Sequence, residues 1–359
     1  MEESKNEGWQ GMNRKLTGRR AFVSAAGLLL AGMRAQPGYA QAKPEKPSVA
    51  IGVGSRASMD CLPLIVAERL GYFEAEGLEV EVREHGGGLR ALQAVLDGAD
   101  DVVAGPFEQT IGLQGRNQFF RAFVLICRAP QVALGVSTRT MPGYRSLADL
   151  KGRKIGVSMA GSGAETVAGM VLTGAGISLQ DVGFVELASV SAALASVRAG
   201  RLDAISFGEP LMTMLEHKAD VRIVSDTRTL KGTQQLFGGL MPANCLHAPN
   251  DFVQKNPRTV QALSNAVVHA LKWLQTAGPS DIIKTVSDPY MYGDRSLYLA
   301  SFNKAREAIA VDGVIADDGP RTALRAMGRL NADIHPAKID LARTYTNEFS
   351  KKAKDKFRA

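Results

Sequence analysis

Apolar positions along residues 48–207 follow two alternating periods, one typical of strands and one typical of helices. The first series contains predicted strands and helices, in chain order, at 48–53, 62–73, 78–83, 89–96 and 101–104. A second series repeats this order at 154–157, 162–172, 182–187, 191–197 and 203–207. Short strands that alternate with helices indicate βαβ units and parallel sheets.

The two series superpose with an offset of 102 residues, which places Leu92 and Val103 on Leu194 and Ile205. In each copy a glycine follows the second helix and an aspartate precedes the last strand. Two copies are too few for a solenoid, which needs at least three repeats. The pattern therefore predicts an α/β protein of two similar lobes, each a parallel-sheet unit.

From residue 257 onward the chain is predicted to be helical. Pro257 stands at a helix start, where its missing N–H costs nothing. One face of the predicted helix is apolar and consists of Val260, Leu263, Val267, Leu271 and Leu274. We expect this region to pack around a lobe and not to form a third domain.

Residues 1–42 are predicted to be a signal peptide. The apolar run Ala21–Met33 has 13 residues, whereas a membrane helix needs about 20, and Ala40–Ala42 supplies a small-residue cleavage site. Arg19 and Arg20, followed closely by Phe22, resemble the twin-arginine export signal. Met12 is a second candidate for the initiator. These features predict a periplasmic protein exported by the twin-arginine route.

Composition excludes several other classes. The net charge of +7 comes from scattered basic residues without interleaved aromatic residues, so we expect no nucleic-acid partner. Cys61, Cys127 and Cys245 are odd in number and far apart, which indicates buried free thiols and no disulfide framework. No histidine pair has metal-ligand spacing, so neither a metal nor a cofactor is expected.

Glycine and small hydroxyl residues gather directly after the predicted strands. In parallel sheets the ligand lies beyond the carboxyl ends of the strands, and helices that begin there offer free N–H groups. The six such segments are 55–60, 85–88, 105–108, 158–166, 188–191 and 208–210. They predict a cleft for a small polar or anionic molecule between the two lobes.

The segment GVSMAGSGAETVAG, residues 156–169, has three competing interpretations. A P-loop needs a lysine after its second glycine, but Ser162 follows Gly161, and a dinucleotide loop needs a third glycine where Thr166 stands. A serine elbow centred on Ser158 needs glycine where Ala160 stands. Histidines follow Ser158 in the chain, so residue order alone leaves a hydrolase open. A helix start that holds a ligand is the favoured interpretation.

Several phrases resemble one protein superfamily. "LPLIVAERLGYFEAEGLEVEV", "SLADLKGRKIGVSMAGSGAET" and "FVQKNPRTVQALSNAVVHALKWL" are similar to the nitrate, taurine, aliphatic-sulfonate and hydroxymethylpyrimidine binding proteins of ABC importers. The resemblance implies a hinged, two-lobed periplasmic binding protein of type II. Lobe I would comprise 43–137, with a return at 245–359, and lobe II 138–244, with crossovers in "ALGVSTRT" and "MPANCLHA".

The resemblance also implies a monomer that delivers a small-molecule ligand to an ABC permease in the inner membrane. His85, which ends a strand beside three glycines, fits equally a ligand donor and a plain loop position. With the positions carried over from the family, the candidate ligand-binding residues are Ser58, Met59, His85, Gly86, Gly87, Gly105, Pro106, Phe107, Ser158, Gly161, Ser162, Gly163, Thr166 and Glu209.

The chain departs from the family at the expected ligand charge. Sulfonate binders place an arginine in the cleft, whereas this chain offers only Arg56, Arg90 and Arg128 as candidates. Glu209 would repel an anion unless it binds an amino group or an arginine, which disfavours nitrate. The expected ligand is a taurine-like or sulfonate compound, or a heterocycle near Phe107. The alternatives are an enzyme on the same fold and an exported sensor protein.

Overall fold

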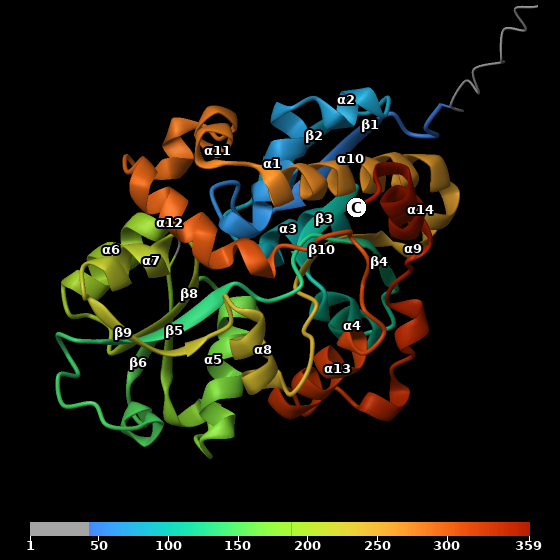
Figure 1. The fold of residues 1–359 in the computed structure, drawn as a ribbon. Helices are drawn as coiled ribbons and strands as arrows, with labels where there is room; N and C mark the ends of the chain where they lie inside the picture. Colours follow the sequence, from blue (N-terminus) through green and yellow to red (C-terminus); the bar gives the residue numbers. More distant parts are fainter. Residues whose placement is uncertain (1–42, 188) are drawn as a thin grey trace, which may run out of the picture. The chain divides into compact units, whose positions relative to one another are not determined.

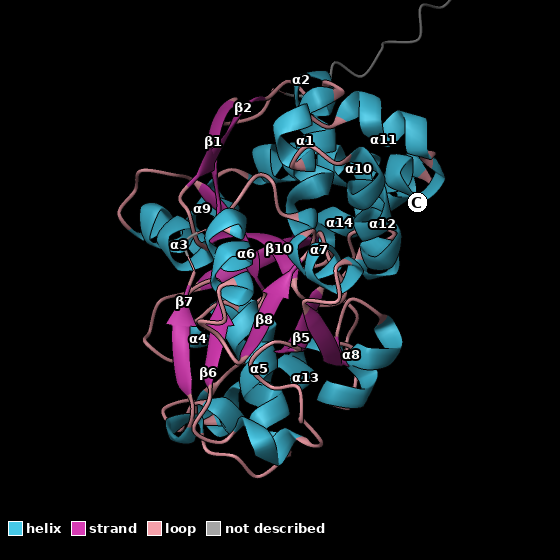
Figure 2. Ribbon diagram, turned by 90° about the vertical axis from the view of Figure 1, so that its left-hand side faces the viewer, coloured by secondary structure: helices cyan, strands magenta, loops and turns pink. Residues whose placement is uncertain are grey.

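The computed structural model describes residues 43–187 and 189–359, which contain two five-stranded sheets. The predicted signal peptide lies outside these residues. The first sheet consists of β2 (Glu79–Glu84), β1 (Ser48–Val53), β3 (Val102–Pro106), β10 (Asn244–Pro249) and β4 (Phe120–Leu125). The second consists of β7 (Gly183–Glu186), β6 (Lys154–Val157), β8 (Ala204–Gly208), β5 (Val132–Ser137) and β9 (Val221–Asp226). Figures 1 and 2 show the two sheets with their helices.

The helices complete two α/β units, and this confirms the predicted fold class. Those that precede β10 are α1 (Leu62–Arg69), α2 (Tyr72–Ala75), α3 (Gly88–Leu96), α4 (Glu108–Gln114), α5 (Gly163–Gly174), α6 (Val190–Arg198), α7 (Leu211–His217) and α8 (Leu230–Phe237). Those that follow it are α9 (Asn250–Lys255), α10 (Pro257–Thr276), α11 (Pro279–Thr285), α12 (Arg295–Ala305), α13 (Gly319–Leu330) and α14 (Glu348–Phe357). Helices α3 and α6 begin 102 residues apart, as do strands β3 and β8. The internal offset seen in the sequence is therefore a repeat of structure.

Each sheet is mixed: its parallel pairings agree with the predicted parallel-sheet units, and one antiparallel strand in each sheet was not predicted. Strand β10 runs antiparallel to β3 and β4, and β5 runs antiparallel to β8 and β9. Both strands reach their sheet by a crossover from the other lobe, so each lobe receives one antiparallel strand from its partner. All six residues of β5 are buried, and a strand buried throughout lacks the alternation that identifies a strand in a sequence.

The crossovers consequently lie earlier than the sequence indicated. The first runs between β4 and β5, at residues 126–131, so "ALGVS" is strand and the predicted lobe boundary after residue 137 falls one strand late. The second runs between α8 and β10, at residues 238–243.

Single predicted elements agree with the structure where their periodicity was strong. The strands at 48–53 and 154–157 have the predicted bounds, and α10 begins at Pro257 and buries the predicted apolar face. The helix predicted at 62–73 is divided into α1 and α2, because Gly71 adopts a left-handed conformation with φ +69°.

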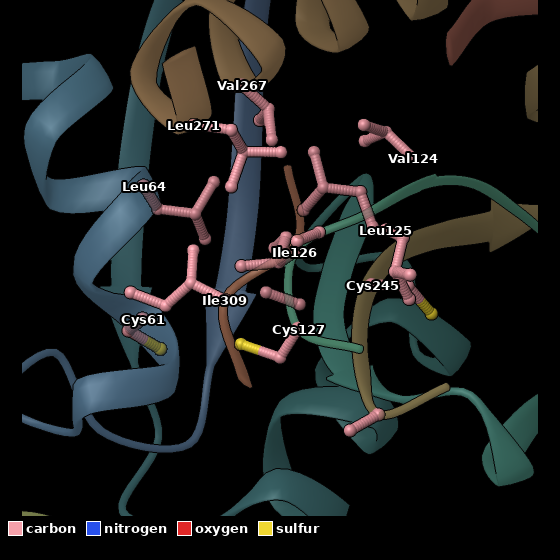
Figure 3. Packing of buried hydrophobic residues seen from close by; sticks show 14 of the residues in the cluster. Cys61, Leu64, Val124, Leu125, Ile126, Cys127, Cys245, Val267, Leu271 and Ile309 are labelled. Carbon is pink, nitrogen blue, oxygen red and sulfur yellow. The ribbon is translucent and has the colours of Figure 1, made fainter. Parts of the chain in front are cut away.

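The core of the first lobe gathers residues from distant parts of the chain. Figure 3 shows Leu64 of α1, Ile126 from the first crossover and Leu271 of α10 in one packed cluster, and all three are fully buried. Cys61, Cys127 and Cys245 are buried free thiols, as predicted. The described part of the chain holds no helix long and apolar enough to cross a membrane.

The C-terminal region was expected to return to lobe I, and it contacts both lobes. Helix α13 packs against α4 beside the first sheet and α5 beside the second, and α12 packs against α7. Lys304 of α12 also forms an ion pair with Glu216 of α7, with Nζ and Oε2 2.5 Å apart. These contacts connect the lobes in addition to the two crossovers.

Candidate functional site

A cavity of about 480 Å³ lies where the loops that follow the strands of both sheets meet. Its volume is about sixteen times the roughly 30 Å³ that a water molecule takes in the liquid. Ten of the fourteen residues predicted from the sequence line it, namely Ser58, Gly86, Gly87, Gly105, Pro106, Ser158, Ser162, Gly163, Thr166 and Glu209. The topology therefore brings most of the predicted residues together around one space.

Four predicted residues do not line this cavity. Met59 and Phe107 are fully buried in the core, and the Phe107 ring packs edge-on against Tyr345. His85 directs Nε2 to Oδ2 of Asp100 at 2.6 Å, which gives the ring a partner within its own lobe. Gly161 is the fourth, and it packs against Leu89.

Two glycines accept apolar side chains from the opposite lobe. A Cβ at Gly87 would lie 2.4 Å from Sδ of Met159, and a Cβ at Gly161 would lie 2.8 Å from Cδ1 of Leu89. Both distances are far below van der Waals contact, so a side chain at either position would require Met159 or Leu89 to move. The positive φ values of Gly87 and Gly161 disfavour other residues as well. The segments at the starts of α3 and α5 thus contact each other between the lobes.

Glutamate side chains of the protein accept hydrogen bonds from the loop N–H groups that were expected to hold an anion. The Gly161 N–H donates to Glu165 at 2.5 Å, and the Ala160 N–H donates to Glu186 at 3.0 Å. Ser162 is the N-cap of α5: its hydroxyl accepts from the Glu165 N–H and donates to the Met159 carbonyl. Side chains of the protein itself therefore bond the N–H groups of Ala160, Gly161 and Glu165.

No lysine, arginine or histidine is among the cavity-lining residues of the described chain. Arg56 forms an ion pair with Glu68 and donates to the Tyr290 hydroxyl at 2.8 Å, while Arg128 donates to the Glu307 carbonyl. A serine elbow at Ser158 would lack its histidine base here. Within the described residues, no cluster of histidine, cysteine and carboxylate side chains could hold a metal ion.

Glu209 lines the cavity but is already neutralised. Its Oε1 lies 2.7 Å from Nη1 of Arg228, and its carboxylate also accepts from the Thr213 hydroxyl and N–H. Arg228 in turn pairs with Asp226 and Glu216, so the charges of this group are satisfied outside the cavity.

Three further carboxyl residues, Asp60, Glu84 and Glu108, line the cavity and were not among the site residues predicted from the sequence. Burial raises the pKa of Glu108 to about 7, although a hydrogen bond with Thr166 of the other lobe opposes the rise. Burial likewise raises the pKa of Asp60, and a hydrogen bond with Ser58 offsets part of it. Glu108 begins α4 and directly follows Phe107. Of the residues predicted in this loop, Gly105 and Pro106 line the cavity and Phe107 does not.

Three buried amides that line the cavity, Gln109, Gln131 and Asn244, have side-chain oxygens without a hydrogen-bond donor. Their nitrogens are bonded: Asn244 Nδ2 donates to the Asp60 carbonyl at 3.0 Å, and Gln131 Nε2 donates to the Cys127 sulfur at 3.2 Å. Gln131 lies in the first crossover and Asn244 begins β10 directly after the second, where no periodicity marks a functional position.

Tyr290 and Tyr292 line the cavity from the C-terminal region. The sequence "SDPY" indicated only a break between helices, so it gave no signal for these residues. Further apolar lining comes from Leu187, Val190, Phe207, Phe237 and Met241. Because the lining combines apolar side chains with polar acceptors, the cavity suits an organic molecule that carries polar groups.

Comparison with known proteins agrees with this architecture. A family model described as the NMT1-like family matches residues 42–286. A protein of Brucella abortus (strain 2308), named as a binding protein, is 26% identical over 220 residues, which cover 61% of this chain. The chain spans 64% of that curated relative's length, slightly under two thirds.

Solved structures extend the likeness over more of the chain. A protein of Bordetella bronchiseptica RB50 is 46% identical, with a TM-score of 0.86 over 88% of this chain and 100% of its own. The alkanesulfonate-binding protein SsuA from Xanthomonas axonopodis pv. citri, solved with bound MOPS, has a TM-score of 0.67 at 17% identity and covers 84% and 99%. The desulfurization enzyme DSZB has a TM-score of 0.57 at 16% identity, over 87% and 99%, so the fold also carries an enzyme.

Proposed function

Because the chain belongs to the NMT1-like family and has the two-lobed fold of periplasmic binding proteins, we propose that it captures a small solute for an ABC importer. The observation that carries the proposal is the cavity of about 480 Å³ between corresponding loops of the two lobes. Residues from both lobes contribute to its wall, so a bound solute would stabilise the closed arrangement over an open one. A permease in the inner membrane would then recognise the closed form.

The proposed site of action is the periplasm, in accord with the twin-arginine motif at Arg19 and Arg20. We expect the protein to act as a monomer, since one chain supplies the whole cavity wall described above.

The ligand expected from the sequence was a sulfonate, a taurine-like compound, a related nitrogen or sulfur compound, or a heterocycle near Phe107. SsuA binds alkanesulfonates, as its name states, but the cavity of this chain has no basic side chain to balance a sulfonate. The chemistry of the cavity lining favours a solute with N–H groups over a simple sulfonate or nitrate.

A thermal-unfolding screen of the purified protein tests the proposal. The panel contains amines, amino-heterocycles, taurine, alkanesulfonates and nitrate, and a solute at 100 times its Kd should add about 2.7 kcal/mol to the unfolding free energy. Each solute that raises the melting temperature is then incubated with the protein and assayed for chemical change. If the chain converts that solute to a product, the protein is an enzyme and the proposal fails.

A variant that fills the cavity provides the control for specific binding. Ser58→Phe should abolish the stabilisation, because Ser58 lines the cavity and a phenyl ring takes up its volume. The matched variant Ser178→Phe, at the cap of a short turn outside the cavity, should retain it.

A further inference from the structure

The chemistry of the cavity wall identifies a class of solute. We infer that the solute is a compact organic cation, an ammonium or amidinium compound, whose N–H groups donate to Glu108 and Asp60. Its carbon frame would contact Phe207, Phe237 and Tyr290. This inference rests on the proposed function and goes beyond it, because neither the fold nor the family relationship determines the charge of the solute.

The charge of the lining is the first argument. The lining includes the carboxyl groups of Asp60, Glu84, Glu108 and Glu209 and no basic side chain of the described residues. Glu209 is balanced by Arg228 at 2.7 Å. Asp60 forms a hydrogen bond with Ser58, and Glu108 forms one with Thr166. Among the described residues, no arginine or lysine is bonded to either of these two carboxyl groups. A buried carboxyl group without a cation shifts toward its neutral form, and a cationic solute would supply the charge that stabilises the carboxylate.

The backbone donors of the site give the second argument. Beside the cavity, the N–H groups of Ala160 and Gly161 donate to Glu186 and Glu165. In the first lobe the Arg56 N–H donates to Glu84, which lines the cavity, at 2.9 Å. These carboxylates use donors that an anion could otherwise bind, and their negative charge disfavours an anion nearby.

The buried amides give an independent third argument. Gln109, Gln131 and Asn244 are 8%, 2% and 5% exposed, line the cavity and have side-chain oxygens without a donor. Their orientation is held by the amide nitrogens: those of Asn244 and Gln109 donate to backbone carbonyls, and that of Gln131 donates to a thiol. A buried acceptor without a donor is costly, so these oxygens favour a solute rich in N–H groups.

The pKa shifts of Asp60 and Glu108 agree with a cationic solute at this site. Burial raises the pKa of Glu108 to about 7 and raises that of Asp60 as well. A cation that pairs with Glu108 favours its charged form, so binding below pH 7 would release a proton.

Calorimetric titration of the full-length protein with solutes of one frame and different charge tests the inference. The probes are benzylamine, benzamidine, benzyl alcohol, benzoate and benzenesulfonate. We expect the amine or amidine to bind at least tenfold more tightly than the alcohol, and the two anions to bind more weakly still. Titrations at pH 6 in buffers of different ionisation enthalpy should show proton release with the cations.

Variants assign the effect to the carboxyl group. Glu108→Gln keeps the shape of a protonated glutamate and should weaken the cation at least tenfold. Glu348→Gln makes the same charge change on exposed α14 and should bind as the wild type does. Asp60→Asn provides a second test if Glu108→Gln does not fold.

The possible results separate the two proposals. Tighter binding of benzoate or benzenesulfonate would overturn the cation inference and leave solute binding in place. Equal cation affinity in the wild type, Glu108→Gln and Asp60→Asn would overturn it as well. No binding of these probes, together with no stabilisation by any solute of the wider panel, would overturn both proposals.

Discussion

Glu209 and Arg228 form an ion pair in the second lobe, with Oε1 and Nη1 2.7 Å apart and side chains only 0% and 2% exposed. The pair resolves the question that Glu209 raised in the sequence, because the carboxylate at the cavity wall is balanced by an arginine behind it. Its charge is therefore a structural feature of the wall.

Replacing Arg228 should lower the free energy of unfolding of the protein. Arg228→Met leaves Glu209 buried without a cation, and breaking a buried pair in this way costs about 3–5 kcal/mol. Urea denaturation measures the loss. Arg295→Met removes an ion pair that is mostly exposed, with Asp288, and should cost at most about 1 kcal/mol. Equal losses in the two variants would contradict the structural role of Arg228.

The contact between Gly87 and Met159 predicts an effect on lobe closure. Gly87→Ala forces a Cβ to within 2.4 Å of Sδ of Met159, and overpacking of this kind costs roughly 1–3 kcal/mol. The φ of +157° at Gly87 disfavours alanine in any arrangement of the lobes, whereas the clash with Met159 exists only when the lobes meet. The clash should therefore weaken solute binding in calorimetric titrations, in addition to any loss of stability.

Two further variants test the origin of the strain. In the double variant Gly87→Ala/Met159→Ala the side chain at position 159 is shortened. This variant should recover part of the lost affinity, because the methyl group added at position 87 then has space. Gly143→Ala, where a Cβ would meet nothing within 4 Å, should leave affinity unchanged. Failure of the double variant to recover any affinity would remove closure strain as the cause.

Ser162 should contribute mainly to stability. Its hydroxyl is already bonded to the Glu165 N–H and the Met159 carbonyl, so Ser162→Ala removes a helix cap. Such a loss typically costs about 0.5–2 kcal/mol, to be measured by denaturant unfolding. Ser162→Thr retains a capping hydroxyl and should keep most of the stability. A large loss of solute affinity in Ser162→Ala without a loss of stability would instead assign the hydroxyl to the ligand.

Stability should depend on pH through two buried groups with opposite signs. The pKa of Glu108 is raised from 4.5 to about 7, so its contribution is present below 4.5 and is lost as the pH rises to about 7. The pKa of His247 is lowered by burial from 6.5 to about 4, so its contribution grows as the pH rises over that range. The two effects oppose each other between pH 4.5 and 6.5.

Glu108→Gln separates these contributions. Relative to the wild type, its unfolding free energy should rise with pH between 4.5 and 7, by up to about 1.4 kcal/mol per pH unit. Denaturant unfolding at several pH values provides the measurement, and Glu348→Gln should parallel the wild type. Parallel curves for Glu108→Gln and the wild type would show that the Glu108 carboxyl does not have a raised pKa.

Much of the fold could be predicted because its signals are local. The βαβ pattern, the repeat between α3 and α6, and the amphipathic face of α10 all follow from the spacing of apolar residues. The antiparallel strands β5 and β10 escaped prediction, since nearly all of their residues are buried and both strands are exchanged between lobes. Sheet membership of that kind depends on contacts distant in sequence, which no local period records.

The site could be predicted at the level of loops and less well at the level of residues. The loops after the strands do form the cavity, but their glycines and Ser162 largely serve packing and capping. Glu165 and Glu186 accept hydrogen bonds from the loop N–H groups that were expected to bind an anion. This arrangement depends on side-chain directions, which the sequence pattern does not record. Tyr290 and Asn244 reach the cavity from segments that carry no motif.

The most direct test of solute capture is a calorimetric titration of the wild-type protein with the solute that stabilises it most, followed by recovery of that solute. The account predicts heat that saturates at one solute per chain, no heat with Ser58→Phe, and a solute recovered chemically unchanged. Continuous heat after mixing, with a product in the recovered solution, would contradict it.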